Sequence, residues 1–183
     1  MISRIIALFI LFIIFPLLLL ISFLIILDDG FPFLFFQKRV GKNNKFFKIV
    51  KFRTMKNNTP DIPTHQLAIS KNLFIKCGFF LRKYSLDELP QLFNIIKGDL
   101  NFIGPRPALH NQKDLIDLRA EYGIDKLKPG ITGWSQVNGR DSLSIKEKVE
   151  LDNFYLINRS PYLSFIILYK TFIQLIKPKN VSH

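Results

Sequence analysis

A run of 23 uncharged and mostly apolar positions, from Ile5 to Leu27, dominates the beginning of the chain. At about 1.5 Å per residue, a helix of this length reaches about 35 Å, which is enough to cross the hydrocarbon core of a bilayer. Pro16 lies at its centre, where proline removes a hydrogen bond and clashes with an earlier carbonyl group. The run predicts a kinked membrane helix and leaves two topologies open, a spanning helix or a hairpin that returns from one leaflet.

Positive charges are distributed unevenly around this run. Only Arg4 precedes it, whereas Lys38, Arg39, Lys42 and Lys45 follow it closely. Because cytoplasmic flanks carry the excess of lysine and arginine, we expect the body of the protein on the cytoplasmic side. We therefore divide the chain into a membrane segment, residues 1–30, and a domain at the cytoplasmic face, residues 31–183.

Residues 31–55 have two aromatic-rich stretches separated by "KNNK", which predicts a β-hairpin with its turn at positions 42–45. Lys51 and Arg53 are two positions apart and would share a strand face, although Ile49 interrupts the alternation. That face is either a solvated basic surface or an anion pocket. Residues 56–70 contain two prolines and predict a loop, with His65 at the surface.

A helical pattern of apolar residues begins beside an acidic pair. Two starts for this helix are possible: Ser85 and Glu88 match a capping box, whereas Pro90 favours a start near Leu89. In either case Asp87 and Glu88 lie at a helix N-terminus, where phosphates also bind. The pattern consists of Leu86, Leu89, Leu92, Phe93 and Ile96.

The remaining patterns complete a mixed architecture. Residues 108–123 predict an amphipathic helix that ends at Gly123, and residues 128–140 are too rich in glycine and proline for a helix but contain a turn at Asn138-Gly139. Residues 161–179 predict an apolar helix that either lies at a membrane interface or packs in the core. The chain is thus expected to form an α+β fold, a single, mainly helical domain with one small β-hairpin.

The charge balance narrows the choice of partners. The 183 residues include 26 Lys and Arg against 14 Asp and Glu, a formal net charge of +12, and 48% are hydrophobic. Nucleic acid, anionic lipid and phosphorylated small molecules would suit that charge, and the membrane segment favours the last two. Cys77 is the single cysteine, so no internal disulfide is possible. Arg106 stands between two prolines, and this stiff backbone loses little entropy when an anion binds.

Four motifs, in this order, resemble the bacterial sugar transferase family and, more closely, its small monotopic phosphoglycosyl transferases: "FFQKRVGKNNKFFKIVKFRTM", "SLDELPQLFNIIKGDLNFIGPRP", "KPGITGWSQVNGR" and "LDNFYLINRSPYLSFIILYKTF". The resemblance implies a bacterial enzyme of the inner membrane. It would move a sugar-1-phosphate from a UDP-sugar to undecaprenyl phosphate, release UMP and begin the assembly of a glycan. Membrane lipids would be its other partners, and nucleic acid would not be one.

The resemblance also implies roles for individual residues. Asp87 would be the nucleophile, and its neighbour Glu88 would bind Mg²⁺ and take part in catalysis. Expected substrate-binding residues are Lys51, Arg53, Arg82, Arg106 and Asp152, with Arg53 included because it shares the predicted strand face of Lys51. Carboxylate attack on phosphorus suits this set, because phosphoryl transfer needs positioning and charge neutralisation.

Two other functions remain open at this point. A membrane glycosyltransferase would transfer the sugar without its phosphate and release UDP. A non-catalytic module would hold anionic lipid through its positive charge, but it would need neither the acidic pair nor the rigid "PRP" sequence. The nucleotide product distinguishes the two enzymes.

Overall fold

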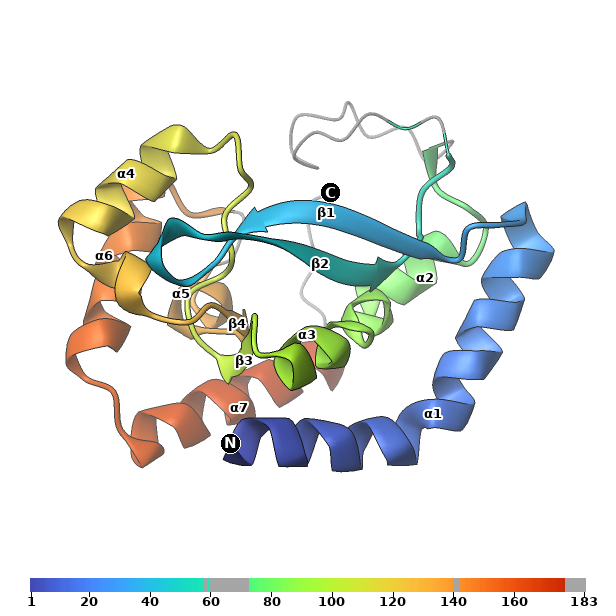
Figure 1. Ribbon diagram of the computed structural model, residues 1–183, viewed down its shortest axis with the longest axis horizontal. Helices are drawn as coiled ribbons and strands as arrows, with labels where there is room; N and C mark the ends of the chain where they lie inside the picture. The colour runs from blue at the N-terminus through green and yellow to red at the C-terminus, as the bar shows by residue number, and fades with distance from the viewer. Residues whose placement is uncertain (58, 60–72, 140–141, 177–183) are drawn as a thin grey trace.

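The computed structural model describes residues 1–57, 59, 73–139 and 142–176. Most of the expected loop at 56–70 lies outside these ranges, and so does His65. Within them the fold is mixed and mainly helical, which confirms the predicted class (Figure 1). The helices are α1 (Ile2–Asp29), α2 (Gly78–Lys83), α3 (Gln91–Lys97), α4 (Lys113–Glu121), α5 (Trp134–Val137), α6 (Ile145–Ile157) and α7 (Pro161–Ile176). The strands are β1 (Leu34–Val40), β2 (Phe46–Phe52), β3 (Asn101–Ile103) and β4 (Gly130–Thr132).

The first helix, α1, bends sharply in its middle, where it contains Pro16, so the predicted kink is confirmed (Figure 1). Both halves pack on the rest of the chain. Ala7 lies in one core cluster with residues of β2 and α3, and Ile21 and Ile25 lie in another with Phe52. The remaining apolar side chains of α1 are mostly exposed. By length and composition α1 could cross a membrane. It also contributes side chains to the core, so the membrane segment, residues 1–30, and the rest of the chain pack against each other.

Both ends of α1 are attached to the body. Near the N-terminus, Arg4 Nη2 donates to the carbonyl oxygen of Lys97 at the end of α3, at 3.4 Å. At the other end, Arg53 forms an ion pair with Asp29 and donates to the carbonyl oxygens of Asp29 and Gly30, at 3.1 and 2.7 Å. The last carbonyl groups of a helix have no partner within it, so Arg53 satisfies groups that would otherwise need water.

The β1–β2 hairpin crosses the middle of the molecule and confirms the prediction for residues 31–55 (Figure 1). Its antiparallel register runs from the Leu34–Phe52 pair to the Val40–Phe46 pair. The turn is a short 3₁₀ segment, Lys42–Asn44, in which Asn43 has a φ of 54°. Asparagine tolerates this left-handed conformation better than most residues, which explains the turn.

Residues 128–140 contain a helix, so the prediction that excluded one there is wrong. The short helix α5 occupies Trp134–Val137, four positions without glycine or proline, and begins after the extended Gly133. Ahead of it, β4 pairs in parallel with β3. A side chain at Gly133 would place its Cβ 2.1 Å from the carbonyl oxygen of Gly104, so this contact requires glycine. The predicted turn at Asn138-Gly139 is confirmed.

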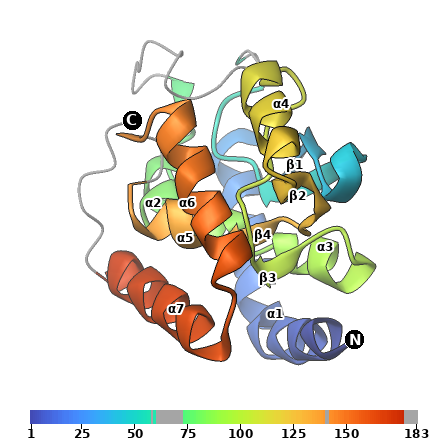
Figure 2. The same ribbon diagram turned by 90° about the vertical axis from the view of Figure 1, so that its left-hand side faces the viewer.

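The C-terminal half is helical. The predicted helix of residues 108–123 is present as α4 but is shorter, and Gly123 follows it with a φ of 69°. The next helix, α6, starts with a capping box between Ser144 and Glu147. In α7 Leu163 and Ile167 are buried in a core cluster with Val137 and Tyr155, whereas most of the other apolar side chains are exposed, so one face of this helix packs in the core. The helix α7 and the N-terminal half of α1 lie on the same side of the molecule (Figures 1 and 2).

Candidate active site

The acidic pair lies on a single 3₁₀ turn, Leu86–Glu88, between α2 and α3. Ser85 precedes the turn in a left-handed conformation, and its side chain makes no capping hydrogen bond. The capping-box alternative is therefore wrong. Pro90 occupies the N-cap position of α3, which begins at Gln91, two residues after the predicted start near Leu89. Asp87 and Glu88 therefore lie before the regular helix, and the 3₁₀ turn decides where their side chains point.

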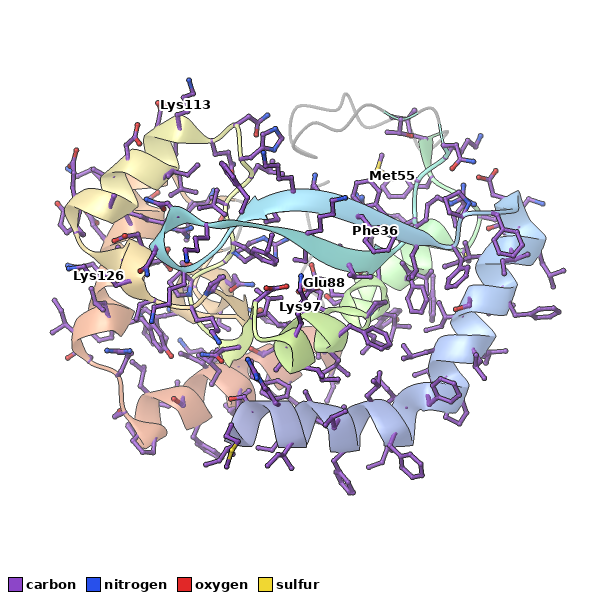
Figure 3. All side chains as sticks on the ribbon, in the orientation of Figure 1. Phe36, Met55, Glu88, Lys97, Lys113 and Lys126 are labelled. Carbon is purple, nitrogen blue, oxygen red and sulfur yellow. The ribbon has the colours of Figure 1, made fainter. Side chains whose placement is uncertain are left out.

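The carboxylate of Glu88 meets two of the expected cations. Its Oε1 atom lies 2.6 Å from Lys51 Nζ on β2 and 3.6 Å from Arg106 Nη2. Figure 3 shows Glu88 near the middle of the molecule, beneath the hairpin. The side chain of Arg106 is 40% exposed, whereas those of Lys51 and Glu88 are 14% and 16% exposed. The Lys51–Glu88 ion pair is thus largely sheltered from solvent, and Arg106 is the more exposed partner of Glu88.

Asp87 is buried, with only 7% of its surface exposed. Loss of hydration raises the pKa of this carboxyl group from its ordinary value of 3.8 to about 6, and Lys51 opposes the shift. The charge of Glu88 raises the pKa further, and Arg82 and Arg106 lower it. A carboxyl group with a raised pKa in a sheltered cluster of charges is typical of a functional site.

Arg82 lies beside the acids at the end of α2. Its Nε donates to Thr54 Oγ1 at 2.9 Å, its Nη2 lies 3.1 Å from Met55 Sδ, and its guanidinium stands 5.1 Å from the ring centre of Phe74. Burial lowers the pKa of Arg82, and the charges of Asp87 and then Glu88 oppose that shift. The segment that follows β2 therefore holds this cation in place.

The arrangement provides a sheltered carboxyl group, a second carboxylate and three cations, which suits chemistry on a phosphate. The chain also matches the bacterial sugar transferase family over residues 1–178. It belongs to that family. This bacterial sugar transferase is therefore an enzyme that transfers a group, and the fully non-catalytic alternative is excluded.

Three relatives of this sugar transferase are informative. The uncharacterized sugar transferase EpsL of Bacillus subtilis is 42% identical over 78% of this chain and 69% of its own length. The exopolysaccharide production protein ExoY of Sinorhizobium fredii is 35% identical over 85% of this chain and 75% of its own. The UDP-N-acetylgalactosamine-undecaprenyl-phosphate N-acetylgalactosaminephosphotransferase of Aeromonas hydrophila is 37% identical over 85% of this chain but only 38% of its own length.

Two of the expected substrate-binding residues form their hydrogen bonds away from the acidic pair. Arg53, only 5% exposed, binds the end of α1 as described above. Asp152 on α6 is 1% exposed and accepts hydrogen bonds from Arg119, at 2.5 and 3.1 Å, and from Ser135, at 2.7 Å. No pattern in the sequence predicts a role for Arg119 or Ser135. Their positions carry no local signal, because the contacts join residues far apart in the chain.

The residues of this sugar transferase fit a metal ion that arrives with a substrate better than one that is held permanently. Among the described residues, no group of three or more His, Cys, Asp or Glu side chains could hold a metal. Mg²⁺ commonly binds through one or two carboxylates and the phosphates of a substrate, keeping several waters. Glu88, with Asp87 beside it, offers that limited number of oxygen ligands.

Proposed function

We propose that the protein transfers a sugar-1-phosphate from a UDP-sugar to undecaprenyl phosphate, as the first step in assembling a glycan. The observation that carries the proposal is the buried carboxyl group of Asp87 beside the Glu88–Lys51 ion pair and Arg106. The name of the Aeromonas hydrophila relative contains both substrates, and the name of the Sinorhizobium fredii relative points to exopolysaccharide. Membership of the family supports sugar transfer as the reaction class.

Asp87 is the nucleophile in this proposal. A carboxylate oxygen attacks the β-phosphorus of the UDP-sugar, the bond to the bridging oxygen breaks, and UMP leaves with that oxygen. The phosphosugar is then held on Asp87 as an acyl-phosphate. A phosphate oxygen of undecaprenyl phosphate attacks the same phosphorus, which releases the carboxylate and forms the undecaprenyl-diphosphate-sugar. The pKa of about 6 leaves Asp87 largely ionised at neutral pH while keeping it more basic than an exposed aspartate.

The cations around Asp87 neutralise the diphosphate. Arg106, the most exposed of those that contact Glu88, is the group that meets the incoming substrate first. Its planar fork suits two phosphate oxygens. Lys51 is held by Glu88 at 2.6 Å, so its position costs little further ordering. Mg²⁺ held by Glu88 together with the substrate's phosphates would supply additional positive charge when bound.

The two ends of α1 support a location at one face of the bacterial inner membrane. A straight helix of 28 residues would separate its ends by about 42 Å. Instead, Arg4 contacts the end of α3 and Asp29 pairs with Arg53, both on the same body. This supports a hairpin inserted into one leaflet. The excess of positive charge after α1 supports the cytoplasmic face, where a nucleotide sugar and a lipid phosphate are both within reach.

The identity of the nucleotide product tests the proposal. Purified protein in detergent is incubated with undecaprenyl phosphate, Mg²⁺ and a panel of UDP-sugars, and the nucleotides are separated. Release of UMP is expected. Release of UDP would instead indicate a glycosyltransferase that leaves the phosphate behind.

The covalent intermediate has its own test. With donor labelled in the sugar, wild-type protein should retain label that hydroxylamine removes, because hydroxylamine cleaves acyl-phosphates. The Asp87→Asn protein should neither retain label nor turn over, since an amide is a far weaker nucleophile than a carboxylate. An active Asp87→Asn protein would exclude Asp87 as the nucleophile.

A further inference from the structure

The backbone that carries Arg106 is held at three successive carbonyl groups. The carbonyl oxygen of Pro105 accepts from the Gly130 amide at 3.0 Å, and that of Pro107 accepts from Arg39 Nη1 at 3.1 Å. Between them, the carbonyl oxygen of Arg106 itself accepts from Arg119 Nη1 at 2.8 Å. Three separate parts of the fold therefore converge on one short segment.

Arg119 is itself fixed by buried groups. Its Nη2 and Nε atoms donate to Asp152 Oδ2 at 2.5 and 3.1 Å, and Asp152 Oδ1 accepts from Ser135 Oγ at 2.7 Å. All three residues are buried, with 9% of Arg119, 1% of Asp152 and 4% of Ser135 exposed. A charge pair in this setting is sensitive to the loss of either partner, because the remaining charge would be left buried and uncompensated.

The segment also borders a pocket. A shallow pocket is lined by all three residues of the Pro105–Pro107 segment and by Arg119. Pro105 and Pro107 are buried, whereas Arg106 between them is only partly buried. The prolines restrict φ at their own positions, but they do not fix where the segment lies. Its hydrogen bonds to neighbouring elements have to do so.

We propose that Arg119, held by Asp152 and Ser135, is a positioning residue for Arg106. The fork of Arg119 joins the buried Asp152 to the main chain of Arg106, and thereby sets the point from which the Arg106 guanidinium reaches toward Glu88. Asp152 acts through Arg119 and does not touch the substrate. Both of its carboxylate oxygens are occupied, and 1% exposure leaves no surface for a substrate to reach.

Hydrogen exchange tests the positioning without any assumption about the reaction. The test variant is Arg119→Lys, because lysine keeps the charge beside Asp152 but lacks the fork that also reaches Arg106. The control is Ser144→Ala, which removes the N-cap of α6, the helix that carries Asp152, without touching the Arg119 contacts.

The prolines have no amide hydrogen, so the readout is the exchange of the Gly104 and Leu109 amides, which are hydrogen-bonded on either side of the segment. Their exchange should be about tenfold faster in Arg119→Lys than in wild type, as expected for loss of a hydrogen bond from a charged donor. It should be unchanged in Ser144→Ala. Ser135→Ala, which removes one hydrogen bond and leaves both charges, should accelerate the same amides to a smaller extent, and it decides the matter if Arg119→Lys does not fold. Exchange at the wild-type rate in the folded variants would overturn the proposal.

A double-mutant cycle tests the consequence for catalysis, and this part rests on the proposed function. The ratio kcat/KM for the donor is measured for wild type, Arg119→Lys, Arg106→Lys and the double variant. If Arg119 acts through Arg106, Arg119→Lys should lower kcat/KM by about tenfold or more in wild type. In the Arg106→Lys background the further loss should stay below about twofold.

Equal losses in both backgrounds would show that Arg119 supports the fold in general, and would overturn the proposal. Failure of the wild-type protein to release UMP would count against the proposed function. The exchange rates would still decide whether Arg119 positions the segment, so the two failures are distinguishable.

Discussion

Replacing the buried acid Asp87 should stabilise the protein while it abolishes turnover. At neutral pH the folded protein holds a carboxylate that loses most of its hydration. This cost and the repulsion of Glu88 together exceed the attraction of Lys51, Arg82 and Arg106, because the net pKa is raised. Asp87→Asn removes the charge with little change in shape. In the proposed reaction, this lost stability belongs to the group that attacks the phosphorus.

The size of the gain follows from the pKa. The folded-state pKa of Asp87 is about 6 against an ordinary value of 3.8. A difference of about two units at about 1.4 kcal/mol per unit gives a gain of about 3 kcal/mol. For a chain of this length that corresponds to about 6 to 12 °C in Tm.

The gain should depend on pH in a defined direction. A raised carboxyl pKa makes the folded protein bind the proton more tightly, so the wild type loses stability as the pH rises from about 4 through about 6. Asp87→Asn has no such loss. The difference in Tm between the two proteins should therefore be near zero at about pH 4 and complete above about pH 7.

The measurement is thermal unfolding of both proteins in the same detergent across this pH range. Asp117→Asn, an exposed site on α4, is the control, and it should change stability by less than about 0.5 kcal/mol at any pH. A Tm difference that is absent at neutral pH, or that favours the wild type, would refute the argument. The attraction of the three cations would then outweigh the burial of Asp87.

Three further outcomes are expected. The ratio kcat/KM should rise with pH through about 6, because Asp87 has to be ionised to attack, and a flat profile across that range would argue against this role. Arg106→Lys should lower kcat/KM at least about tenfold although the charge is kept, because a flexible ammonium does not replace a planar fork. Near-normal activity would reduce Arg106 to a structural role. Pro16→Leu should straighten α1 and carry the N-terminus across the membrane. A cysteine at Ser3, in a background without Cys77, should then be labelled from outside the cytoplasmic membrane only in the Pro16→Leu protein, and labelling of the unsubstituted protein from outside would favour a spanning helix.

Local signals in the sequence were sufficient for several elements. The apolar run and Pro16 predict a kinked α1, the two asparagines predict the turn between β1 and β2, and Pro90 predicts the start of α3 within two residues. Each of these features depends on the conformational preference of a residue at its own position. The short helix α5 was missed because a helix of four residues has too little periodicity to detect.

Contacts between residues far apart in the chain could not be predicted from the sequence patterns. Charge and spacing made Arg53 a candidate for anion binding, but they could not reveal that the carbonyl groups at the end of α1 would lie against it. The pairing of Arg119 with Asp152 joins positions 33 residues apart, on helices that meet only in the folded chain. Such pairs depend on tertiary packing, and a single sequence contains no periodic trace of them.

The two adjacent acids differ because of the turn that carries them. Successive residues on a 3₁₀ turn point about 120° apart, so the side chains of Asp87 and Glu88 leave the turn in different directions, although the charges of Lys51 and Arg106 act on both. One direction leads into the buried interior, where loss of hydration makes the carboxylate of Asp87 more basic. The other leads to Lys51 and Arg106, where the carboxylate of Glu88 is held among cations. A regular helix starting at Ser85 would place the acids about 100° apart and commit Glu88 to the cap. The break between Ser85 and Pro90 therefore keeps Glu88 out of a helix cap, and its carboxylate pairs with Lys51 instead.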